Sequence, residues 1–445
     1  MATKKPSLVK VSLWGTQVGV LAEQNNRVLF QYLPEYLHDG VSISPLLLPL
    51  SNQPFENVAK RDVFGGLMGV FADSLPDLYG KKIIRNYFQT KYNDPRYMPG
   101  PLHTLMYIGS RGIGALEYAP VDQHTIEAVE ALQLADMVAY AKRVINGDFD
   151  RENDAMSVIT SIMQSGSLAG GARPKAVIGW DRARNSIIAG VPPLPRGYEH
   201  WLIKFDGTRG QPEDWGKVEF VYSEIAKLCG IEMSETRMIR ECGRAHFMTK
   251  RFDIDDQGNR LHMHSLSGLM HNDFNEQRSM DYSQFFDAVR FVTRDEREVR
   301  KAFQRLAYNF VGRNCDDHTK NFSFLMENDG AWRLSPQYDL CYSYGQDRNS
   351  WVNQHQMTVL GNDDFTREDV LAIGKAYDIT DAKTILEVTD AAFAQWPKLA
   401  AKQGIDGALI RECESTLMLD RKRYVQSAPM PANPPKVSDS SEPSP

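Results

Sequence analysis

The sequence predicts an α+β protein with a small N-terminal α+β subdomain, a strand-rich middle region and a mostly helical C-terminal lobe. Short runs in which apolar and polar residues alternate, which are typical of strands, lie before residue 253. Apolar residues at helical spacing dominate from residue 281 onward. The 445 residues are enough for about two or three domains, each with its own hydrophobic core.

The composition is that of an ordinary soluble globular protein, with 42% hydrophobic and 24% charged residues. The net charge of −6 argues against a protein that coats nucleic acid. The five cysteines include no C-x-x-C pair, which argues against a zinc site or a disulfide framework. The N-terminus lacks the apolar run of a signal peptide, and no window has the ~18 apolar residues of a membrane span. We therefore expect a cytoplasmic protein with no membrane partner.

The first predicted unit spans residues 1–122. VKVSLWG and VLFQYL both alternate and are separated by a polar turn at Glu23–Arg27, which predicts a β-hairpin. Residues 63–90 have helical spacing, interrupted at Pro76 and Asp77. The strand GIGALEYAP is expected to close this unit.

The middle region is assigned to residues 123–253. It begins with helical patterns over 123–163, and a glycine-rich loop, GSLAGGARPK, follows. AVIGW, SIIAG and HWLIKFD are predicted strands. A helix is predicted at 216–229, and two further strands follow it at 236–241 and 245–252.

The C-terminal lobe is assigned to residues 254–425. DYSQFFDAVRFV and EREVRKAFQRLAYNFVGR have strong helical spacing, FSFLMENDGAWRLSPQYDL is expected to form a hairpin, and helices resume through 366–424. The tail at 426–445 is rich in Pro and Ser and is expected to be disordered.

A polar cluster, NCDDHTKNFSF, directly follows the second of these helices. Asp316 and Asn321 within it have the D-x-x-x-x-N spacing of a protein-kinase catalytic loop. In that loop the Asp orients or deprotonates the acceptor hydroxyl, and the Asn holds a magnesium ion. Asp339 lies beyond the predicted hairpin, where a kinase places its second metal-binding Asp, although D-F-G itself is absent.

Lys204 lies inside the apolar strand HWLIKFD. A buried ammonium group is costly unless an anion meets it, so this lysine is a candidate for binding ATP phosphates. The next predicted helix offers Glu219 and Glu224 as partners for Lys204, and the sequence does not choose between them.

The glycine-rich loop and the strand HFMTKRFD complete the candidate nucleotide site. Glycines free the backbone to wrap phosphate oxygens, and basic residues of the loop add charge. The loop candidates are Gly166, Gly170, Gly171, Arg173 and Lys175. The strand stands where a kinase hinge presents its backbone to adenine, with candidates Lys250, Arg251 and Phe252.

The order of these parts favours a protein-kinase-like bilobal fold that uses ATP and Mg²⁺. A glycine loop, a strand lysine, an acidic helix, a strand pair, D-x-x-x-x-N and a further Asp follow one another as they do in kinases. Each part alone is common in turns or strand ends, so the prediction depends on the order.

Several motifs of the sequence resemble those of a known family. Asp-Asp-His-Thr-Lys-Asn-Phe-Ser resembles the D-x-H-x-K-N-F-S motif of HipA-type kinases, the toxins of type II toxin–antitoxin modules. Ser-Leu-Ala-Gly-Gly-Ala-Arg-Pro-Lys resembles their S-x-x-G-A-x-x-K loop, Lys-Arg-Phe-Asp their E-R-F-D hinge and Gln-Tyr-Asp-Leu their Y-D metal motif. Phe-Ala-Asp-Ser-Leu-Pro-Asp and Gly-Ile-Gly-Ala-Leu are similar to their N-terminal subdomain. The resemblance covers residues 9–425.

The resemblance implies a role for each matching residue. Asp316 is expected to be the catalytic base, Asn321 and Asp339 the magnesium ligands, Lys204 the phosphate-binding lysine and His318 a support for the loop. A loop serine is autophosphorylated in this family, which ejects the loop and stops activity. Ser167 matches that serine best, but one additional glycine follows it, so Ser165 is the second candidate. Lys250 replaces the usual hinge acid.

The resemblance also implies a biological setting. It suggests a Ser/Thr protein kinase toxin that phosphorylates an aminoacyl-tRNA synthetase, such as glutamyl-tRNA synthetase, and causes growth arrest and persistence. It implies a small DNA-binding antitoxin as partner, so that this acidic chain meets DNA only through the antitoxin.

Three other functions compete with this hypothesis. A catalytically weak ATP-binding co-repressor or scaffold would be expected to lack one of Lys204, Asp316, Asn321 and Asp339, yet all four are present. A metal-dependent hydrolase could use Asp316, Asp317 and His318, with His262 and His264 as further candidates, although a polar strand explains those two histidines as well. A small-molecule kinase would share every ATP-site residue.

Overall fold

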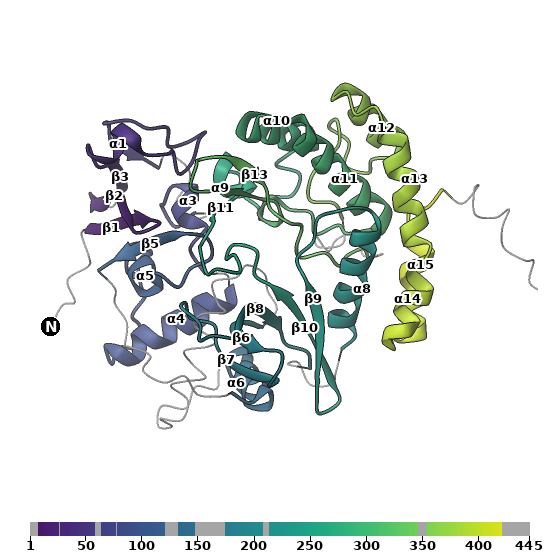
Figure 1. The fold of residues 1–445 in the computed structure, drawn as a ribbon, viewed down its shortest axis with the longest axis horizontal. Coiled ribbons are helices and arrows are strands. Elements are labelled where there is room, and N and C mark those ends of the chain that lie inside the picture. Colours follow the sequence, from purple (N-terminus) through teal and green to yellow (C-terminus); the bar gives the residue numbers. More distant parts are fainter. Residues whose placement is uncertain are drawn as a thin grey trace, which may run out of the picture.

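Three antiparallel sheets and a set of helices on their flanks make up the described part of the chain (Figure 1). The computed structural model describes residues 8–25, 27–57, 64–76, 78–120, 132–146, 174–207, 213–345 and 354–420. The predicted α+β class is confirmed. The 1–122 unit lies beside both later regions, and the C-terminal helices gather at the opposite end of the molecule.

The N-terminal sheet has the strand order β4-β3-β2-β1-β5. Its strands are β1 (Leu8–Leu13), β2 (Thr16–Gln24), β3 (Arg27–Tyr32), β4 (Phe55–Glu56) and β5 (Leu116–Ala119). The sequence predicted a single hairpin in this segment, but the structure has two: β1 pairs with β2, and β2 pairs in turn with β3. Trp14 and Gly15 both have positive φ, as the tightest hairpin turns require, and so the chain reverses earlier than the alternation predicted.

Helices α1 (Tyr36–Asp39), α3 (Gly69–Ala72), α4 (Leu78–Lys91) and α5 (Pro101–Ile108) accompany this sheet. The expected interruption of the 63–90 segment is confirmed, since α3 and α4 are separate. Helix α5 was not predicted. Seven of its eight residues are buried, so it has no polar face and no helical periodicity to reveal it.

The second sheet has the order β7-β6-β8-β10-β9 and contains the predicted middle strands. Its strands are β6 (Lys175–Asp181), β7 (Ser186–Ala189), β8 (Glu199–Lys204), β9 (Thr236–Glu241) and β10 (Arg244–Lys250). Helix α6 (Leu134–Asn146) confirms part of the expected 123–163 helix, and the rest lies outside the described residues. Helix α8 (Trp215–Leu228) packs between β9 and β10 on one side and the C-terminal helices on the other.

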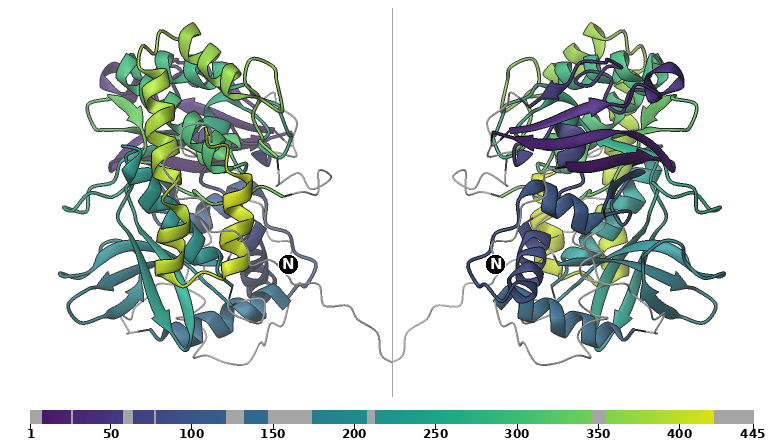
Figure 2. Two further views of the ribbon diagram at one scale, coloured as in Figure 1. Left: turned by 90° about the vertical axis from the view of Figure 1, so that its right-hand side faces the viewer. Right: turned by 90° about the vertical axis from the view of Figure 1, so that its left-hand side faces the viewer.

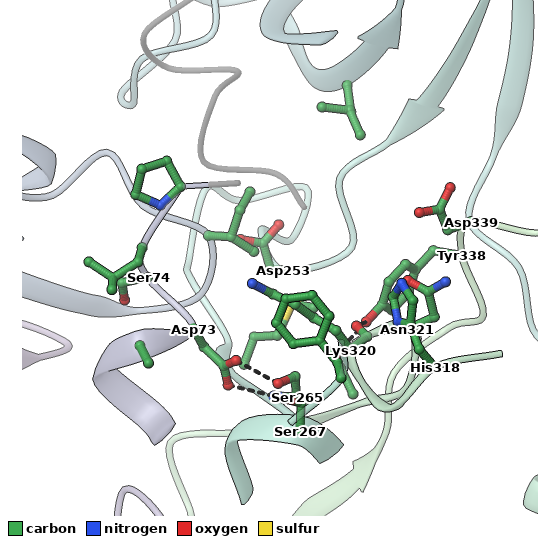
Figure 3. A pocket seen from close by; sticks show the side chains of 18 of the residues that line it. Asp73, Ser74, Asp253, Ser265, Ser267, His318, Lys320, Asn321, Tyr338 and Asp339 are labelled. Atoms are coloured by element: carbon green, nitrogen blue, oxygen red, sulfur yellow. Dashed lines mark hydrogen bonds between the residues drawn. The ribbon is translucent and has the colours of Figure 1, made fainter. Parts of the chain in front are cut away.

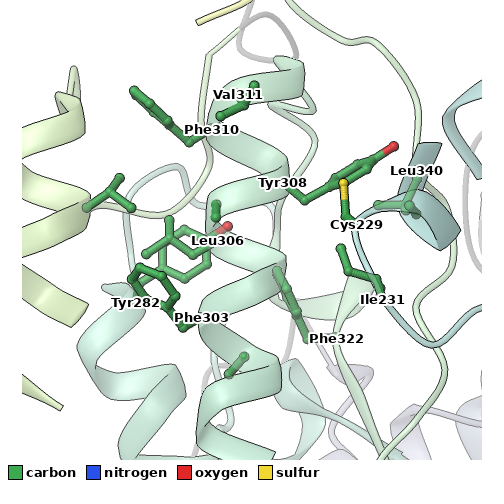
Figure 4. Close-up of a cluster of buried hydrophobic side chains, with 14 of the residues drawn as sticks. Cys229, Ile231, Tyr282, Phe303, Leu306, Tyr308, Phe310, Val311, Phe322 and Leu340 are labelled. Atoms are coloured by element: carbon green, nitrogen blue, oxygen red, sulfur yellow. The ribbon is translucent and has the colours of Figure 1, made fainter. Parts of the chain in front are cut away.

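The C-terminal lobe is built around one long helix, α11, whose apolar side chains form the centre of the largest core (Figure 4). Phe303, Leu306 and Phe310 recur at helical spacing and are buried. The helices of this lobe are α9 (Leu266–Met270), α10 (Tyr282–Thr293), α11 (Glu296–Gly312), α12 (Arg367–Ala376), α13 (Ala382–Phe393), α14 (Trp396–Gln403) and α15 (Gly407–Thr416). The predicted tail lies outside the described residues.

A third sheet joins the predicted hairpin to one additional strand. β12 (Ser323–Met326) and β13 (Trp332–Leu334) form the hairpin, and β11 (His262–Ser265) pairs with β12. The 3₁₀ turn η1 (Thr319–Asn321) leads into β12 and packs against α9. The polar cluster of the sequence is therefore held between a long helix and a sheet.

The N-terminal unit docks on the C-terminal lobe through α3 and α9, which lie close together in the fold (Figure 1). The side views show the purple N-terminal strands next to the green elements of that lobe (Figure 2). The two helices meet at Gly69 and Gly268, where a Cβ atom on Gly69 would overlap the Gly268 carbonyl oxygen. Arg260 donates to the backbone oxygens of Gly112 and Gly114 nearby. The N-terminal unit thereby forms one wall of the space in front of the polar cluster.

Among the described residues, no helix combines the length and the apolar character that crossing a bilayer requires.

Candidate active site

A large cavity opens where the three regions of the chain meet. It has a volume of about 1210 Å³, above the range of ~300–1,000 Å³ that is usual for small-molecule pockets. The residues that line it include Lys204, Glu219, Asp316, His318, Asn321 and Asp339. Figure 3 shows Asn321, Tyr338 and Asp339 together on one side of this cavity, with Asp73 and Ser265 on another.

Lys204 joins two acids that are distant in sequence. Its Nζ donates to Glu219 Oε1 on α8 and to Asp339 Oδ1, the latter at 2.5 Å. The sequence left Glu219 and Glu224 open as partners. The structure places Glu219 against the lysine, while Glu224 pairs with Lys227 at the surface.

The charges of this trio stabilise one another. Burial disfavours the ammonium form of Lys204, but Asp339 and Glu219 outweigh it and raise the pKa of the lysine. Burial likewise disfavours the Asp339 carboxylate, but Lys204 and then Lys175 outweigh it and lower the pKa of Asp339 to about 2. The site therefore holds a fixed cation beside a fixed anion.

Lys175 begins β6 directly opposite Lys204 on β8, and its side chain is buried. Two lysines side by side on neighbouring strands, both facing the acids of the C-terminal lobe, suit an anionic ligand such as a phosphate chain. The remaining loop candidates, Ser165, Gly166, Ser167, Gly170, Gly171 and Arg173, lie outside the described residues.

Asp316 lies on the loop that follows α11, with its carboxylate at the cavity. The helix ends at Gly312, and the φ of 52° at the next residue, Arg313, turns the chain toward the sheet. The Asp316 N–H donates to Ser343 Oγ at 2.8 Å, and Asn321 Nδ2 donates to the Asp316 carbonyl at 2.7 Å. These bonds fix the backbone and leave the carboxylate, which is 39% exposed, available to a ligand.

The electrostatic setting makes Asp316 a stronger base than an ordinary aspartate. Partial burial raises the pKa of Asp316, and the neighbouring Asp339 and Asp317 add to this against the opposing effect of His318. His318 Nε2 lies 3.6 Å from Asp316 Oδ1, and its ring packs on Phe274. His318 is thus placed beside the carboxylate, and its role as a loop support stays a prediction.

Asp317 differs sharply from its neighbour. Its side chain is buried and accepts hydrogen bonds from Tyr282 Oη at 2.8 Å, His355 Nδ1 at 2.8 Å and the Gln356 N–H at 2.6 Å. A carboxylate so fully engaged has no free oxygen to offer a metal in the cavity. This argues against a hydrolase that uses Asp316, Asp317 and His318 together.

The two other histidines proposed for a metal site are also engaged elsewhere. His262 Nε2 bonds the Ile43 carbonyl, and His264 lies between Asp73 and Ser44. The Ser44–His264–Asp73 chain follows the order of a hydrolase triad, but all three lie at the interface of the N-terminal unit, and the Ser44 hydroxyl is buried away from the cavity. Within the described ranges, no group of three or more His, Cys, Asp or Glu is placed to hold a metal.

The hinge candidates have different roles. Lys250 pairs with Asp256 and Glu199, and Phe252 packs on Tyr338, while all three candidates line the cavity. The Arg251 guanidinium turns back to Asp253, with Nη2 at 2.6 Å from Oδ2, so it braces the contact with the N-terminal unit. Asp253 in turn accepts from the Gly114 N–H.

Several cavity residues escaped the sequence analysis as candidates. Tyr338 bonds Ser323 and the Lys320 carbonyl, and thereby ties the Asp339 segment to η1. Asp73 at the end of α3 accepts from both the backbone and the side chain of Ser265. The only sequence signal for Asp73 was the Phe-Ala-Asp-Ser-Leu-Pro-Asp segment, in which polar residues follow an apolar run. Nothing in that segment indicated that Asp73 would contact the C-terminal lobe.

The residues present fit magnesium and ATP. Mg²⁺ prefers oxygen ligands and is usually held by one or two protein groups together with substrate phosphates, so a cluster of three acids is not required. Asn321 and Asp339 supply an amide and a carboxylate from adjacent segments of one cavity, and Lys204 supplies cationic charge in the same lining. Asp339 also has a φ of 56°, a strained backbone conformation of the kind that concentrates at functional sites.

Comparisons with known proteins identify the fold and the family of this chain. A search of solved structures finds a HipA chain from a Shewanella oneidensis complex of HipA, HipB and operator DNA, at 14% identity and a TM-score of 0.66, covering 94% of this chain and 97% of that chain. The Helicobacter pylori proinflammatory kinase CtkA matches at 13% identity, with a TM-score of 0.34, over 51% of this chain and 91% of its own. The first match shows a shared fold.

A Haemophilus influenzae protein named "Putative kinase" is 26% identical over 138 residues, which cover 27% of this chain and only 39% of that protein. The family model for the HipA N-terminal domain matches residues 9–119. The model for the HipA-like C-terminal domain matches residues 167–396, just over half of the 445 residues. The chain belongs to the HipA family.

Proposed function

We propose that this protein is an ATP- and Mg²⁺-dependent Ser/Thr protein kinase. The observation that carries the proposal is the convergence of Lys204, Glu219 and Asp339 in one ion-paired group that faces Asp316 and Asn321 across a single cavity. Protein kinases need this set of a phosphate-binding lysine, its acid partner, a base and two metal ligands. Membership of the HipA family supports the same activity.

Each residue has a role that its position allows. Asp316 orients the acceptor hydroxyl and takes its proton, because its carboxylate faces the cavity and its pKa is raised. Lys204 and Lys175 neutralise phosphate oxygens from the sheet side. Asn321 and Asp339 would hold the metal ion, which would offset the charge of the transferred phosphate.

Autophosphorylation of Ser167, or of Ser165, belongs to the same proposal. A phosphate carries about −1.5 to −2 charges, which repel the phosphates of ATP from a nearby pocket. A phosphorylated loop serine therefore shuts the site unless a cation such as Arg173 or Lys175 compensates it.

The proposed biological role is that of a toxin of a toxin–antitoxin module. The target is a translation factor, with an aminoacyl-tRNA synthetase such as glutamyl-tRNA synthetase as the first candidate, and its phosphorylation arrests growth. The HipA chain matched in the structure search was solved with HipB and operator DNA. By analogy we propose a small DNA-binding antitoxin as the partner, with DNA contacted through it.

Two experiments test the activity. Calorimetry of the purified protein with ATP and magnesium is expected to show binding, and no binding contradicts the proposal. Mass spectrometry is expected to find phosphate on Ser167 or Ser165 in the wild type and not in Asp316→Gln. Phosphate that persists in Asp316→Gln contradicts self-modification by this site.

Phosphoproteomics after induction tests the target and its class. New phosphoserine or phosphothreonine on a translation factor, present with the wild type and absent with Asp316→Gln, supports a protein kinase. ATP turnover that needs an added metabolite, with no phosphoprotein, supports a small-molecule kinase instead. An operator-DNA shift by this chain alone contradicts the proposed indirect contact with DNA.

A further inference from the structure

We propose that Asp317 and His355 are positioning residues that lock the catalytic loop and the Asp339 segment into one rigid unit. This inference rests on the proposed kinase function. It assigns to Asp317 a role distinct from that of Asp316, and it gives the segment that begins at residue 354 a part in catalysis, although that segment does not line the cavity.

The first step is the set of contacts around Asp317. Both carboxylate oxygens are used: Oδ1 accepts the Gln356 N–H at 2.6 Å, and Oδ2 accepts His355 Nδ1 and Tyr282 Oη, each at 2.8 Å. Asp317, His355 and Tyr282 are all buried. Three donors from two different segments therefore converge on the residue next to the proposed base.

The second step is a chain of hydrogen bonds that runs from Asp317 to the Asp339 segment. Tyr282 Oη accepts from Asn309 Nδ2 at 3.0 Å, and Asn309 Oδ1 accepts from Asn314 Nδ2 at 2.8 Å. Asn314 Oδ1 then accepts the N–H of Cys341 at 3.2 Å. Cys341 is two residues from Asp339, so a chain of hydrogen bonds links the neighbour of the proposed base to the Asp339 segment through Asn309 of α11.

The positive charge of His355 strengthens its hydrogen bond to Asp317. Burial disfavours the imidazolium of His355, but Cys315 and Asp317 beside it raise the pKa of His355 to about 10. The ring also packs on Phe365, at 4.6 Å between ring centroids. A buried, charge-assisted hydrogen bond is stronger and more directional than a neutral one, so the pair holds the loop in one geometry.

The fourth step is the anchoring of the 354–358 segment itself. Thr358 Oγ1 donates to Asp281 Oδ2, and the Thr358 carbonyl accepts the Tyr282 N–H at 2.9 Å. Asp281 also caps α10. The segment is thus bonded to the start of α10 at Thr358 and to the catalytic loop at His355 and Gln356. It therefore restricts the movement of the loop that carries Asp316.

The test compares Asp317→Asn with the wild type in an ATP-dependent phosphorylation assay. The substitution preserves size but removes the carboxylate that holds His355. Because a displacement of about 1 Å at a catalytic group costs ~100-fold in rate, we expect kcat to fall ~10- to 100-fold. The KM for ATP is expected to stay within about twofold, since Lys204 and Asp339 are untouched.

Asp390→Asn is the matched control. Asp390 is also a buried carboxylate paired with a cation, Arg367, at 2.7 Å, but it lies on α13, away from the cavity. This variant is expected to lose stability and keep the wild-type kcat. If both variants lose kcat equally, the effect of Asp317→Asn is general destabilisation and the proposal is wrong.

A readout independent of activity completes the design. In an NMR titration of the His355 ring, the pKa is expected to fall from about 10 in the wild type to a lower value in Asp317→Asn, because Cys315 remains but the charge and hydrogen bond of Asp317 are lost. Should Asp317→Asn not fold, Tyr282→Phe removes the hydroxyl and with it both of its hydrogen bonds, to Asp317 and from Asn309, and is expected to lower kcat as well.

The outcomes separate this inference from the proposed function. A wild type that has no kinase activity, but in which the His355 pKa is raised and falls in Asp317→Asn, contradicts the kinase proposal alone. An active wild type together with unchanged kcat in both Asp317→Asn and Tyr282→Phe contradicts the positioning role alone.

Discussion

Lys204 and Asp339 are separated by 135 positions in the sequence, yet Lys204 Nζ lies 2.5 Å from Asp339 Oδ1. The lysine belongs to the second sheet and the aspartate to the C-terminal lobe, so this ion pair joins the two regions in the lining of the cavity. Glu219 on α8 is the second acid that pairs with Lys204.

Glu219→Gln is expected to lower kcat/KM ~100-fold, because Lys204 loses the acid that orients its ammonium group toward the phosphates. The side chain of Glu219 is buried and keeps its volume in this variant. Steady-state kinetics of phosphorylation provide the measurement. Glu224→Gln is the control on the same helix: Glu224 pairs with Lys227 at the surface, so its loss is expected to change kcat/KM by less than about twofold.

Asp316→Asn is expected to lower kcat ~100- to 10,000-fold, the usual contribution of a general base. ATP affinity measured by calorimetry is expected to remain close to that of the wild type, because the Lys204 group is intact. Asp364→Asn changes an exposed aspartate and serves as the control for loss of one negative charge. Equal activity in Asp316→Asn and the wild type is the result that removes Asp316 from the mechanism.

His355 predicts a loss of stability at alkaline pH. Its pKa is about 10 in the folded protein and ~6.5 in the unfolded chain, so the folded state binds the additional proton between these values. The stabilisation from His355 is fully present below pH ~6.5 and is lost as the pH rises through about 10. The slope is at most about 1.4 kcal/mol per pH unit.

Urea unfolding of the wild type and His355→Gln at several pH values measures this dependence. The difference between their unfolding free energies isolates His355 from the buried cysteines, which also titrate at high pH. A difference that does not change between pH ~6.5 and ~10 rejects the assignment.

Gly69→Ala is expected to loosen the N-terminal unit from the C-terminal lobe. A methyl group there would overlap the backbone of Gly268, and α3 and α9 cannot separate without disturbing the wall of the cavity. We expect a destabilisation of ~1–3 kcal/mol and reduced activity. Gly100→Ala is the control, because a Cβ at that position meets no atom within 4 Å and its φ is −74°.

Much of the fold was predictable because it depends on local patterns. Strands β6, β8 and β10 alternate or are continuously apolar, and α8, α10 and α11 repeat their apolar residues at helical spacing. The pattern failed at α5, which is buried on nearly all sides, and at the turn of Trp14 and Gly15, where two positive φ values and not hydrophobicity determine the reversal.

The candidate site divides in the same way. The sequence by itself determined that Lys204, Asp316, Asn321 and Asp339 occur in the order of a kinase, because residue type and spacing are written along the chain. Only the tertiary structure decided that Glu219 and not Glu224 meets Lys204, and that Asp317 is buried against His355 while Asp316 faces the cavity. Those choices depend on which side of a helix or loop packs inward, and that is decided by contacts between different secondary-structure elements, such as β8 with α8 and the catalytic loop with the segment at residue 355, which no local pattern records.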